Sequence, residues 1–196
     1  DPLKTANENA QTYFKKYSKL KNSRIHLEEQ IALTVAENDY LELLIVQVEN
    51  AGVGDLDEIR EELIEAGYLK KRQTKQARAK KSARPLLLTV KSSEDLTILV
   101  GRNNTQNDYL TTKLAGPNDT WLHTKDIPGS HVVIRAQDFG EQTLREAAEL
   151  AAYYSKARES SNVPVDYTLI RHVKKPSGAK PGYVTYDRQS TIYVTP

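Results

Sequence analysis

The residues best suited by type to bind or react with another molecule lie mainly between positions 101 and 135. This stretch concentrates asparagines, histidines, basic residues and a tryptophan, with Gly and Pro between them. Loops that carry such side chains on a folded scaffold are where binding usually occurs. The candidate contact residues are Arg102, Asn103, Asn104, Asn107, Trp121, His123, Lys125, His131 and Arg135, joined by Lys174 and Lys175 further along the chain.

Strand periodicity indicates what these side chains could do together. Along an expected strand over 120–125, Trp121, His123 and Lys125 share one face, because side chains alternate between the two faces of a strand. On the next expected strand, His131 and Arg135 share a face in the same way. Aromatic planes can stack on unpaired bases, while Lys and Arg can hold the phosphate backbone. The pattern therefore predicts an RNA-binding surface.

Several of these residues also have a purely structural interpretation. Trp121 can be a core residue or a contact residue, since a tryptophan serves either purpose. Asn107 can be a helix N-cap. Gly129 is explained by a turn requirement alone.

A metal-dependent nuclease is an alternative in which Asp119, His123 and His131 hold the ion. Their spacing matches no standard zinc pattern, and acid-base catalysis by His123 would need a partner that the sequence does not identify. The sequence has no Cys, which excludes thiol nucleophiles and thiolate metal ligands. We therefore expect a binding module without a cofactor rather than an enzyme.

Length and composition predict one ordinary domain with an appendage and no membrane segment. The chain has 196 residues, of which 38% are hydrophobic, enough for a core. The longest aliphatic run, 43–46, is far too short to span a bilayer, and no export signal is visible. We expect a cytoplasmic protein, and the opening Asp1-Pro2 in a chain without Met predicts a piece of something longer.

Charge is distributed unevenly along the chain. Residues 1–69 carry 7 basic and 14 acidic residues, whereas residues 70–196 carry 21 basic and 12 acidic residues. A basic second half predicts a polyanionic partner. Residues 70–84 contain eight Lys or Arg and no acid, which is typical of a solvated linker and equally of a phosphate-binding tether.

The first 68 residues are expected to be helical. From Tyr13, alternate steps of four and three residues trace a mostly apolar seam that is typical of a coiled coil. The first helix should end near Asn50, and a second should follow with Asp55 as its N-cap, Glu58 as its capping-box partner and Gly67 at C′. The second helix can cover only part of the seam, which predicts a homodimer or pairing with an upstream helix. The seam positions are Tyr13, Tyr17, Leu20, Arg24, Leu27, Ile31, Thr34, Asn38, Leu41, Ile45 and Val48.

Residues 85–196 mix strands and helices. The predicted fold class is α+β, with a long coiled-coil-type arm over 1–69, a basic linker over 70–84, and a compact domain of antiparallel hairpins with two helices over 85–196. Pro128 and Gly129 occupy the positions that a type II turn favours. Strands are expected at 86–91, 97–100, 120–124, 131–135, 165–174, 182–186 and 191–194, and helices at 108–115, capped by Asn107, and at 141–160.

Several of these segments together resemble a known family. They are Gly101-Arg-Asn-Asn followed by Asn107-Asp108, the alternating Asp119, Trp121, His123 and Lys125, and Pro128-Gly129-Ser130-His131. Further matches lie at 147–155, 165–167, 173–176 and 182–186. These motifs resemble the NFACT-R domain of the NFACT family, and residues 9–21 resemble the returning half of that family's coiled-coil middle region.

The resemblance implies a function in ribosome quality control. Family members bind the large ribosomal subunit when peptidyl-tRNA is stuck on it, and bacterial members recruit alanyl-tRNA and help add an alanine tail to the stalled chain. The NFACT-R domain is regarded as an RNA-contacting module, and tailing is expected to need the family's N-terminal domains. Some members were described as fibronectin binders, which makes a surface adhesin that binds fibronectin the alternative.

Overall fold

The computed structural model describes residues 1–71 and 84–196. The predicted basic linker, 70–84, therefore lies mostly outside the described residues. The chain divides into two compact units, residues 1–41 and residues 42–196. Among the helices of the described residues, none combines the length and the apolar character that crossing a membrane requires.

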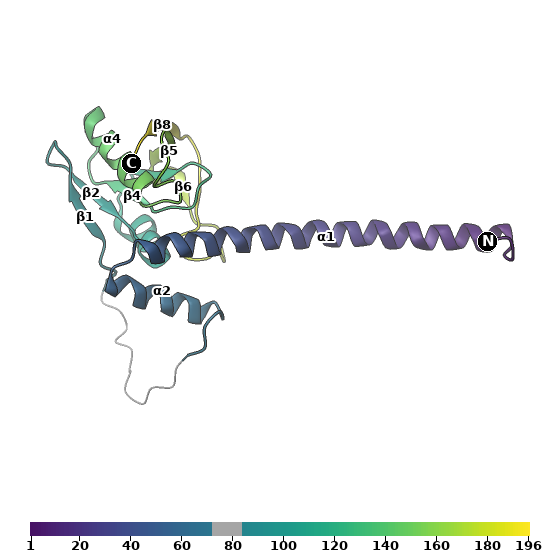
Figure 1. Ribbon diagram of the computed structural model, residues 1–196. Coiled ribbons are helices and arrows are strands. Elements are labelled where there is room, and N and C mark those ends of the chain that lie inside the picture. Colours follow the sequence, from purple (N-terminus) through teal and green to yellow (C-terminus); the bar gives the residue numbers. More distant parts are fainter. Residues whose placement is uncertain (72–83) are drawn as a thin grey trace. The chain divides into compact units, whose positions relative to one another are not determined.

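The first helix, α1, runs without interruption over Ala6–Glu49 (Figure 1). It contains no Gly or Pro, the residues that most disfavour a helix interior. Its first turn is capped reciprocally: the Glu8 N–H donates to the Thr5 hydroxyl at 3.3 Å, and the Thr5 N–H donates to the Glu8 carboxylate at 2.8 Å. The helix ends one residue before the expected position, just ahead of Gly52 and Gly54.

The apolar seam of α1 lies open to solvent. Leu20 is 60% exposed, Leu27 58% and Ile31 62%. The expectation that the second helix covers part of this seam was wrong, because Ile45 and Val48 are also exposed. The buried residues in the last turns of α1 are Tyr40, Leu44, Val46 and Gln47, which lie off the seam.

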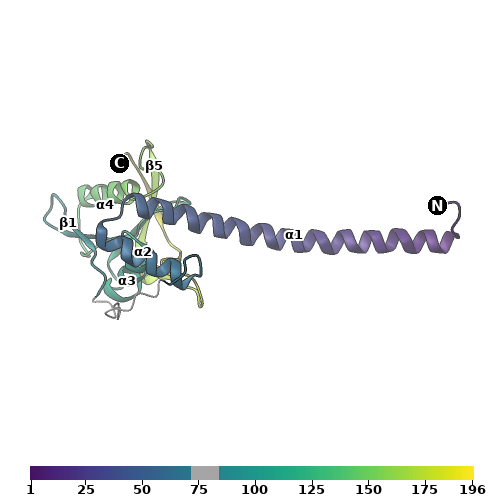
Figure 2. The ribbon, with the colours of Figure 1, turned by 60° about the horizontal axis from the view of Figure 1, so that its bottom comes forward.

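The second helix, α2 (Val53–Glu65), lies beside the short helix α3 (Asn104–Tyr109), as Figure 2 shows. It begins three residues earlier than Asp55 would place it as N-cap. Gly52 is the N-cap instead, and its N–H donates to the Asp55 carboxylate at 2.8 Å. Gly67 has φ +83°, which fits its expected place at the helix C-terminus.

An antiparallel six-stranded sheet forms the centre of residues 42–196, which confirms the α+β class. Its inner strands carry the core, because their residues face packed elements on both sides. A separate two-stranded ribbon joins β6 (Val173–Lys174) to β7 (Thr185–Tyr186). The sheet strands, in spatial order, are β1 (Leu88–Lys91), β2 (Thr97–Val100), β4 (Val132–Ile134), β3 (Thr120–Thr124), β5 (Val163–Leu169) and β8 (Ser190–Val194).

The two faces of the sheet pack against different elements. Helix α4 (Glu141–Tyr153) covers one face with a row of alanines, over residues such as Leu122 and Val132. On the other face, Leu99, Trp121 and Val133 pack with Leu110. Tyr186 of the ribbon and Val184, just before β7, close the cluster. Trp121 thus points away from α4, into a second and smaller core.

Local structure differs from expectation around α3. The expected helix over 108–115 with Asn107 as cap begins earlier: Asn103 is the N-cap, and its side-chain oxygen accepts the Gln106 N–H at 2.8 Å. After α3 the chain continues as a π-helix, Leu110–Leu114, in which the Ala115 N–H donates to the Leu110 carbonyl. Asn107 therefore lies inside a helix rather than at its start.

The expected type II turn at Pro128-Gly129 was wrong. Gly129 lacks the positive φ that such a turn requires, and the positive value falls on Asp126, at 53°. A Cβ on Gly129 would lie 2.7 Å from the Thr124 hydroxyl and 2.9 Å from Cβ of Ser155. Gly129 also forms an isolated bridge with Ser155, which explains why α4 ends at Tyr153 instead of reaching residue 160. Further along the chain, a short helical segment, η2 (Ile170–His172), divides the expected strand over 165–174 into β5 and β6.

Candidate nucleic-acid interface

The beginning of α3 carries several predicted contact residues, and their polar groups are bound within the molecule. Asn103 is fully buried, and its side-chain N–H donates to the Glu58 carboxylate at 2.7 Å. The Arg102 guanidinium pairs with Asp55 at 3.0 Å. Gln106, which the sequence reading missed, donates to the same Asp55 carboxylate at 2.6 Å. These donors face α2 rather than solvent.

Asn104 connects three segments of the chain. Its side-chain N–H donates to the Glu62 carboxylate of α2 at 2.8 Å. Its side-chain oxygen accepts from the Gln47 amide, near the end of α1, at 2.8 Å. We call Asp55, Glu58 and Glu62 the acidic ridge of α2. Their spacing of three and four residues places them on one side of the helix, and this spacing was the sequence signal that could have revealed the contact.

Asn107 ties α3 to the sheet. Its side-chain oxygen accepts the backbone N–H of His131 at 3.0 Å. A Cβ on Gly101 would lie 2.4 Å from that same oxygen and 2.9 Å from the Asn107 backbone nitrogen. Gly101 is therefore required for the close approach, and Asn107 acts as a structural bridge.

The aromatic and imidazole side chains gather on one face of the sheet, as strand alternation predicted. The rings of Trp121 and His123 stack, with centroids 5.7 Å apart and planes 10° from parallel. His131 meets Trp121 edge-on, with centroids 5.1 Å apart. Tyr186 lies against Trp121 with a centroid separation of 4.9 Å. Trp121 is completely buried and His131 nearly so, so the cluster faces the interior.

Burial sets the charge state of this cluster. It lowers the pKa of His123, an effect that nearby backbone groups and Asp166 partly offset. It lowers the pKa of His131 still further, and the neighbouring His123 adds to the shift. The His131 Nδ1 lies 2.7 Å from the Thr111 hydroxyl. Both imidazoles are therefore neutral at neutral pH and do not supply positive charge for a phosphate.

Tyr186 and Asp166 close the cluster from the side of the ribbon. The Tyr186 hydroxyl donates to one Asp166 oxygen at 3.0 Å, and the Thr191 hydroxyl donates to the other at 2.6 Å. Burial, reinforced by the Asp166 carboxylate, raises the pKa of Tyr186 well above its usual value. The phenol thus stays protonated and keeps this hydrogen bond at any physiological pH.

The three residues of the nuclease alternative do not form a metal site. Asp119 is engaged elsewhere: its carboxylate pairs with Arg135 at 3.0 Å and accepts the Gly116 N–H at 2.8 Å. His123 and His131 contact each other edge-on. Within residues 1–71 and 84–196, no group of three or more ligating side chains is placed to hold a metal ion.

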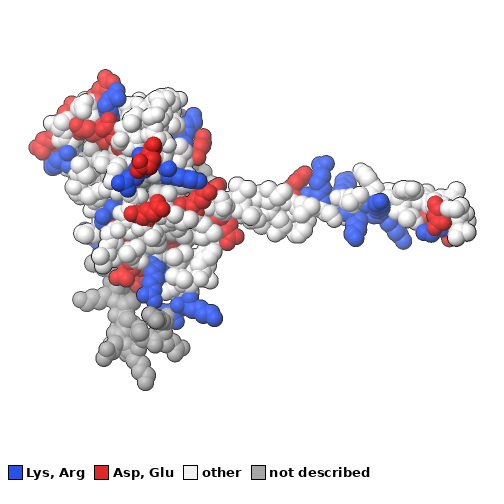
Figure 3. Space-filling model, viewed as in Figure 1, with Lys and Arg blue, Asp and Glu red and all other residues white. Residues whose placement is uncertain are grey.

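The remaining predicted residues are basic and lie at the surface. Lys125, Arg135 and Lys174 are exposed. Arg135 also donates to the Leu114 carbonyl at 3.1 Å, and Lys175 pairs with Asp108. Figure 3 shows acidic and basic side chains interspersed over the visible face of residues 42–196, not one continuous basic area.

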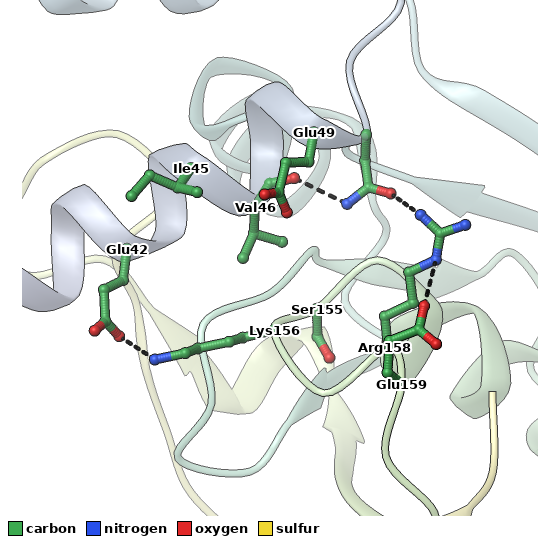
Figure 4. Close-up of a pocket in the computed structure, with 9 residues that line it drawn as sticks. Glu42, Ile45, Val46, Glu49, Ser155, Lys156, Arg158 and Glu159 are labelled. Carbon is green, nitrogen blue, oxygen red and sulfur yellow. Dashed lines mark hydrogen bonds and ion pairs between the residues drawn. The ribbon is translucent and has the colours of Figure 1, made fainter.

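A cavity of about 440 Å³ lies between the last turns of α1 and the segment after α4 (Figure 4). Lys156 pairs with Glu42 at 2.7 Å across it, and Arg158 donates to Asn50 at 3.0 Å. Ile45 and Val46 supply its apolar part. Both cations are already neutralised or bound, so the cavity lacks the surplus positive charge that an RNA site needs.

Comparisons with known proteins agree with the resemblance seen in the sequence. The family model described as NFACT N-terminal and middle domains matches residues 1–82. The model described as the NFACT protein RNA binding domain matches residues 86–187. Rqc2 homolog RqcH of Bacillus subtilis is 59% identical over the whole chain, and RqcH of Streptococcus suis is 47% identical.

A solved structure is also similar over nearly the full length. It is described as the C-terminal of the fibronectin/fibrinogen-binding protein from Streptococcus suis, with a TM-score of 0.86 and 47% identity, covering 99% of this chain and 77% of that one. The chain spans about a third of the length of the curated relatives, 34% of the Bacillus subtilis protein and 35% of the Streptococcus suis protein. The matched models and relatives show that this chain belongs to the NFACT family, with the family's RNA-binding domain over residues 86–187.

Proposed function

We propose that this chain is the RNA-contacting part of a ribosome-associated quality-control factor of the cytoplasm. The observation that carries the proposal is the match of residues 86–187 to the NFACT RNA-binding domain, together with the relatives described as Rqc2 homologs. The RNA partners we propose are the large ribosomal subunit that holds a stalled chain and tRNA, alanyl-tRNA in particular. Alanine tailing would then be an activity of the longer protein.

Among the predicted contact residues, burial separates two roles. Lys125, Arg135 and Lys174 are exposed, and we assign phosphate contacts to them. The buried Asn103, Asn104, Asn107, Trp121 and His131 would support the surface from below, because their side chains are enclosed by protein. Arg102, His123 and Lys175 would act in the same supporting way, through the contacts described above.

The experiment is a binding titration of this chain with tRNA and with isolated large subunits over a series of salt concentrations. Lys125→Ala with Lys174→Ala should lower the affinity and flatten its dependence on salt. With fewer phosphate contacts, the complex releases fewer counterions when it forms. Lys91→Ala is a matched control, since that lysine is exposed at the sheet edge but pairs with Asp95. Equal affinities for the double variant and the wild type would contradict the assignment of these lysines.

Fibronectin binding is a second candidate, because the similar solved structure is described as a fibronectin/fibrinogen-binding protein. A basic surface binds many acidic partners nonspecifically, so the salt dependence decides between a site and a charge effect. Saturable binding of fibronectin that persists at physiological salt would support this candidate. Binding that disappears at that salt would leave RNA as the partner.

We also propose that two copies of this chain associate through the exposed seam of α1. The seam presents Leu20, Leu27 and Ile31 at coiled-coil spacing, and all three are about 60% exposed. A helix with such a seam is stabilised chiefly by a partner helix. In the longer protein the partner could instead be another segment of the same chain, an outcome that the dimer test in the Discussion separates.

A further inference from the structure

We propose that the β6–β7 ribbon is the RNA-contacting surface of residues 86–187, with Tyr183 as a stacking platform for an unpaired base and Lys174 beside it for a phosphate. This inference rests on the proposed RNA-binding function and places it at one surface. Tyr183 was not among the residues selected from the sequence. The Tyr183 ring is exposed, it lies on the same side as Lys174, its loop is anchored to α3, and basic side chains lie close to it in the sequence.

Exposure leaves one aromatic ring available in the RNA-binding region. Among the aromatic side chains of residues 86–187, only Tyr153 and Tyr183 are exposed. The guanidinium of Arg158 lies 4.1 Å from the centroid of the Tyr153 ring, and Arg158 also donates to the Tyr153 hydroxyl. Tyr183 is 59% exposed, and no ring or cation of the described residues covers it. Its face is therefore open to a base.

Alternation along the ribbon turns Tyr183 outward on the same side as Lys174. Burial alternates over 181–186, with Tyr183 and Thr185 exposed and Val184 and Tyr186 packed against the core of Trp121. In the ribbon, Lys174 pairs in register with Thr185. Tyr183 lies two residues before Thr185, just ahead of β7, and its exposure continues the alternation of the strand. We therefore place Tyr183, Thr185 and Lys174 on one outer face.

Helix α3 anchors the loop that carries Tyr183, through residues near both of its ends. The Asp108 carboxylate pairs with Lys175 and accepts the Gly182 N–H at 3.5 Å. Gly182 has φ +76°, and a Cβ there would lie 3.0 Å from the side-chain oxygen of Asn104. Tyr183 is thus attached to a residue that is clamped on two sides. A residue whose neighbouring backbone is already fixed loses less conformational entropy on binding a base than a residue in a mobile loop would.

The chemistry of this face matches single-stranded RNA better than a duplex. An aromatic ring stacks on any unpaired base, because every base has a π-face, and neighbouring lysines track the backbone. Paired bases in an A-form duplex cannot present that face to a side chain. Lys174 supplies one positive charge on the outer face, and Arg171 and Arg188, also exposed, lie close to the ribbon in sequence.

The test compares how variants of this chain bind a short oligoadenylate. Fluorescence anisotropy measures the binding at a series of salt concentrations. Tyr183→Ala should weaken binding about tenfold without changing the salt slope, since stacking neutralises no phosphate. Tyr183→Phe should retain the affinity because the ring remains. Lys174→Ala should reduce the salt slope by about 0.7 for a single strand. Tyr193→Ala on β8, where the ring is 57% exposed, is the matched control and should bind like the wild type.

The outcomes separate the surface from the function. If Tyr183→Ala binds as tightly as the wild type while the wild type still binds oligoadenylate and tRNA, the stacking surface is wrong and RNA binding stands. If Tyr193→Ala loses as much affinity as Tyr183→Ala, the effect is not specific to the ribbon and the inference is also wrong. If the wild type binds no RNA at physiological salt, the proposed function itself fails. Circular dichroism of each variant checks that the fold is unchanged.

Discussion

Two regions of this molecule reverse the usual distribution of polar and apolar residues. Along α1, the seam residues Leu20, Leu27 and Ile31 are apolar and exposed. At the start of α3, Asn103, Asn104 and Gln106 are polar and buried. Apolar surface favours burial, and buried polar groups need hydrogen-bond partners. The polar residues at the start of α3 are hydrogen-bonded to the acidic ridge of α2. The seam, in contrast, is an apolar surface suited to a partner helix.

The largest expected effect concerns the seam. Leu27→Glu with Ile31→Glu should raise the dimer dissociation constant at least about a hundredfold, because burying unpaired carboxylates is costly. Sedimentation equilibrium of the chain measures it. Leu33→Glu is the matched control: Leu33 is 64% exposed but lies off the seam, so the dimer should persist. A wild-type chain that stays monomeric at all concentrations, or a control variant that dissociates equally, would contradict dimerisation through the seam.

A smaller effect is expected at the buried polar region. Asn104→Ala removes the hydrogen bonds to Gln47 and Glu62 and should lower the free energy of unfolding by about 2–3 kcal/mol, since buried polar groups lose their partner. Urea denaturation followed by the fluorescence of Trp121 measures the change. Asn118→Ala, an exposed asparagine that accepts from Arg171, should cost less than about 0.5 kcal/mol. Equal losses would mean that Asn104 contributes nothing beyond a surface amide.

The smallest expected effect comes from pH and sharpens the same comparison. His123 and His131 have lowered pKa values in the folded state, so the unfolded chain takes up protons first as the pH falls. Their contribution to stability is complete above the unfolded pKa of about 6.5 and is lost progressively as the pH falls below it, by at most about 1.4 kcal/mol per pH unit for each histidine.

Urea denaturation at several pH values between neutral and mildly acidic tests this prediction. His131→Gln should reduce the slope of stability against pH, because one fewer proton is taken up on unfolding. Asn118→Ala, at an exposed residue without an ionisable side chain, is the control and should leave the slope unchanged. A wild-type stability that does not vary with pH over this range would contradict the buried, neutral state of the pair.

Much of the fold follows from local sequence patterns. The length of α1 is set by a run without Gly or Pro, and the hairpins of the sheet follow from alternating apolar residues. The shared face of Trp121 and His123 also follows from alternation. The contact surface does not follow, because local patterns cannot show which polar residues meet one another across the fold. Asn103 and Asn104 resemble ligand-binding residues until the acidic ridge of α2, more than forty residues earlier, is placed beside them.

Two local predictions failed for the same physical reason. Pro128-Gly129 has the sequence of a type II turn, but contacts with Thr124 and Ser155 explain the glycine through close packing instead. Asn107 is a good N-cap by type, yet the buried N–H of His131 needs its side-chain oxygen. In both cases a tertiary contact outweighed a local preference of about 1 kcal/mol.

The π-helix Leu110–Leu114 has a consequence for how relatives of this chain can vary in length. A π-turn holds one residue more than an α-turn, so it behaves as a one-residue insertion accommodated within a helix. The wider turn begins at Leu110 and carries Thr111, whose hydroxyl lies 2.7 Å from the His131 Nδ1. In a homologue that lacks one residue here, the helix should become regular, and the imidazole should pair with a different residue.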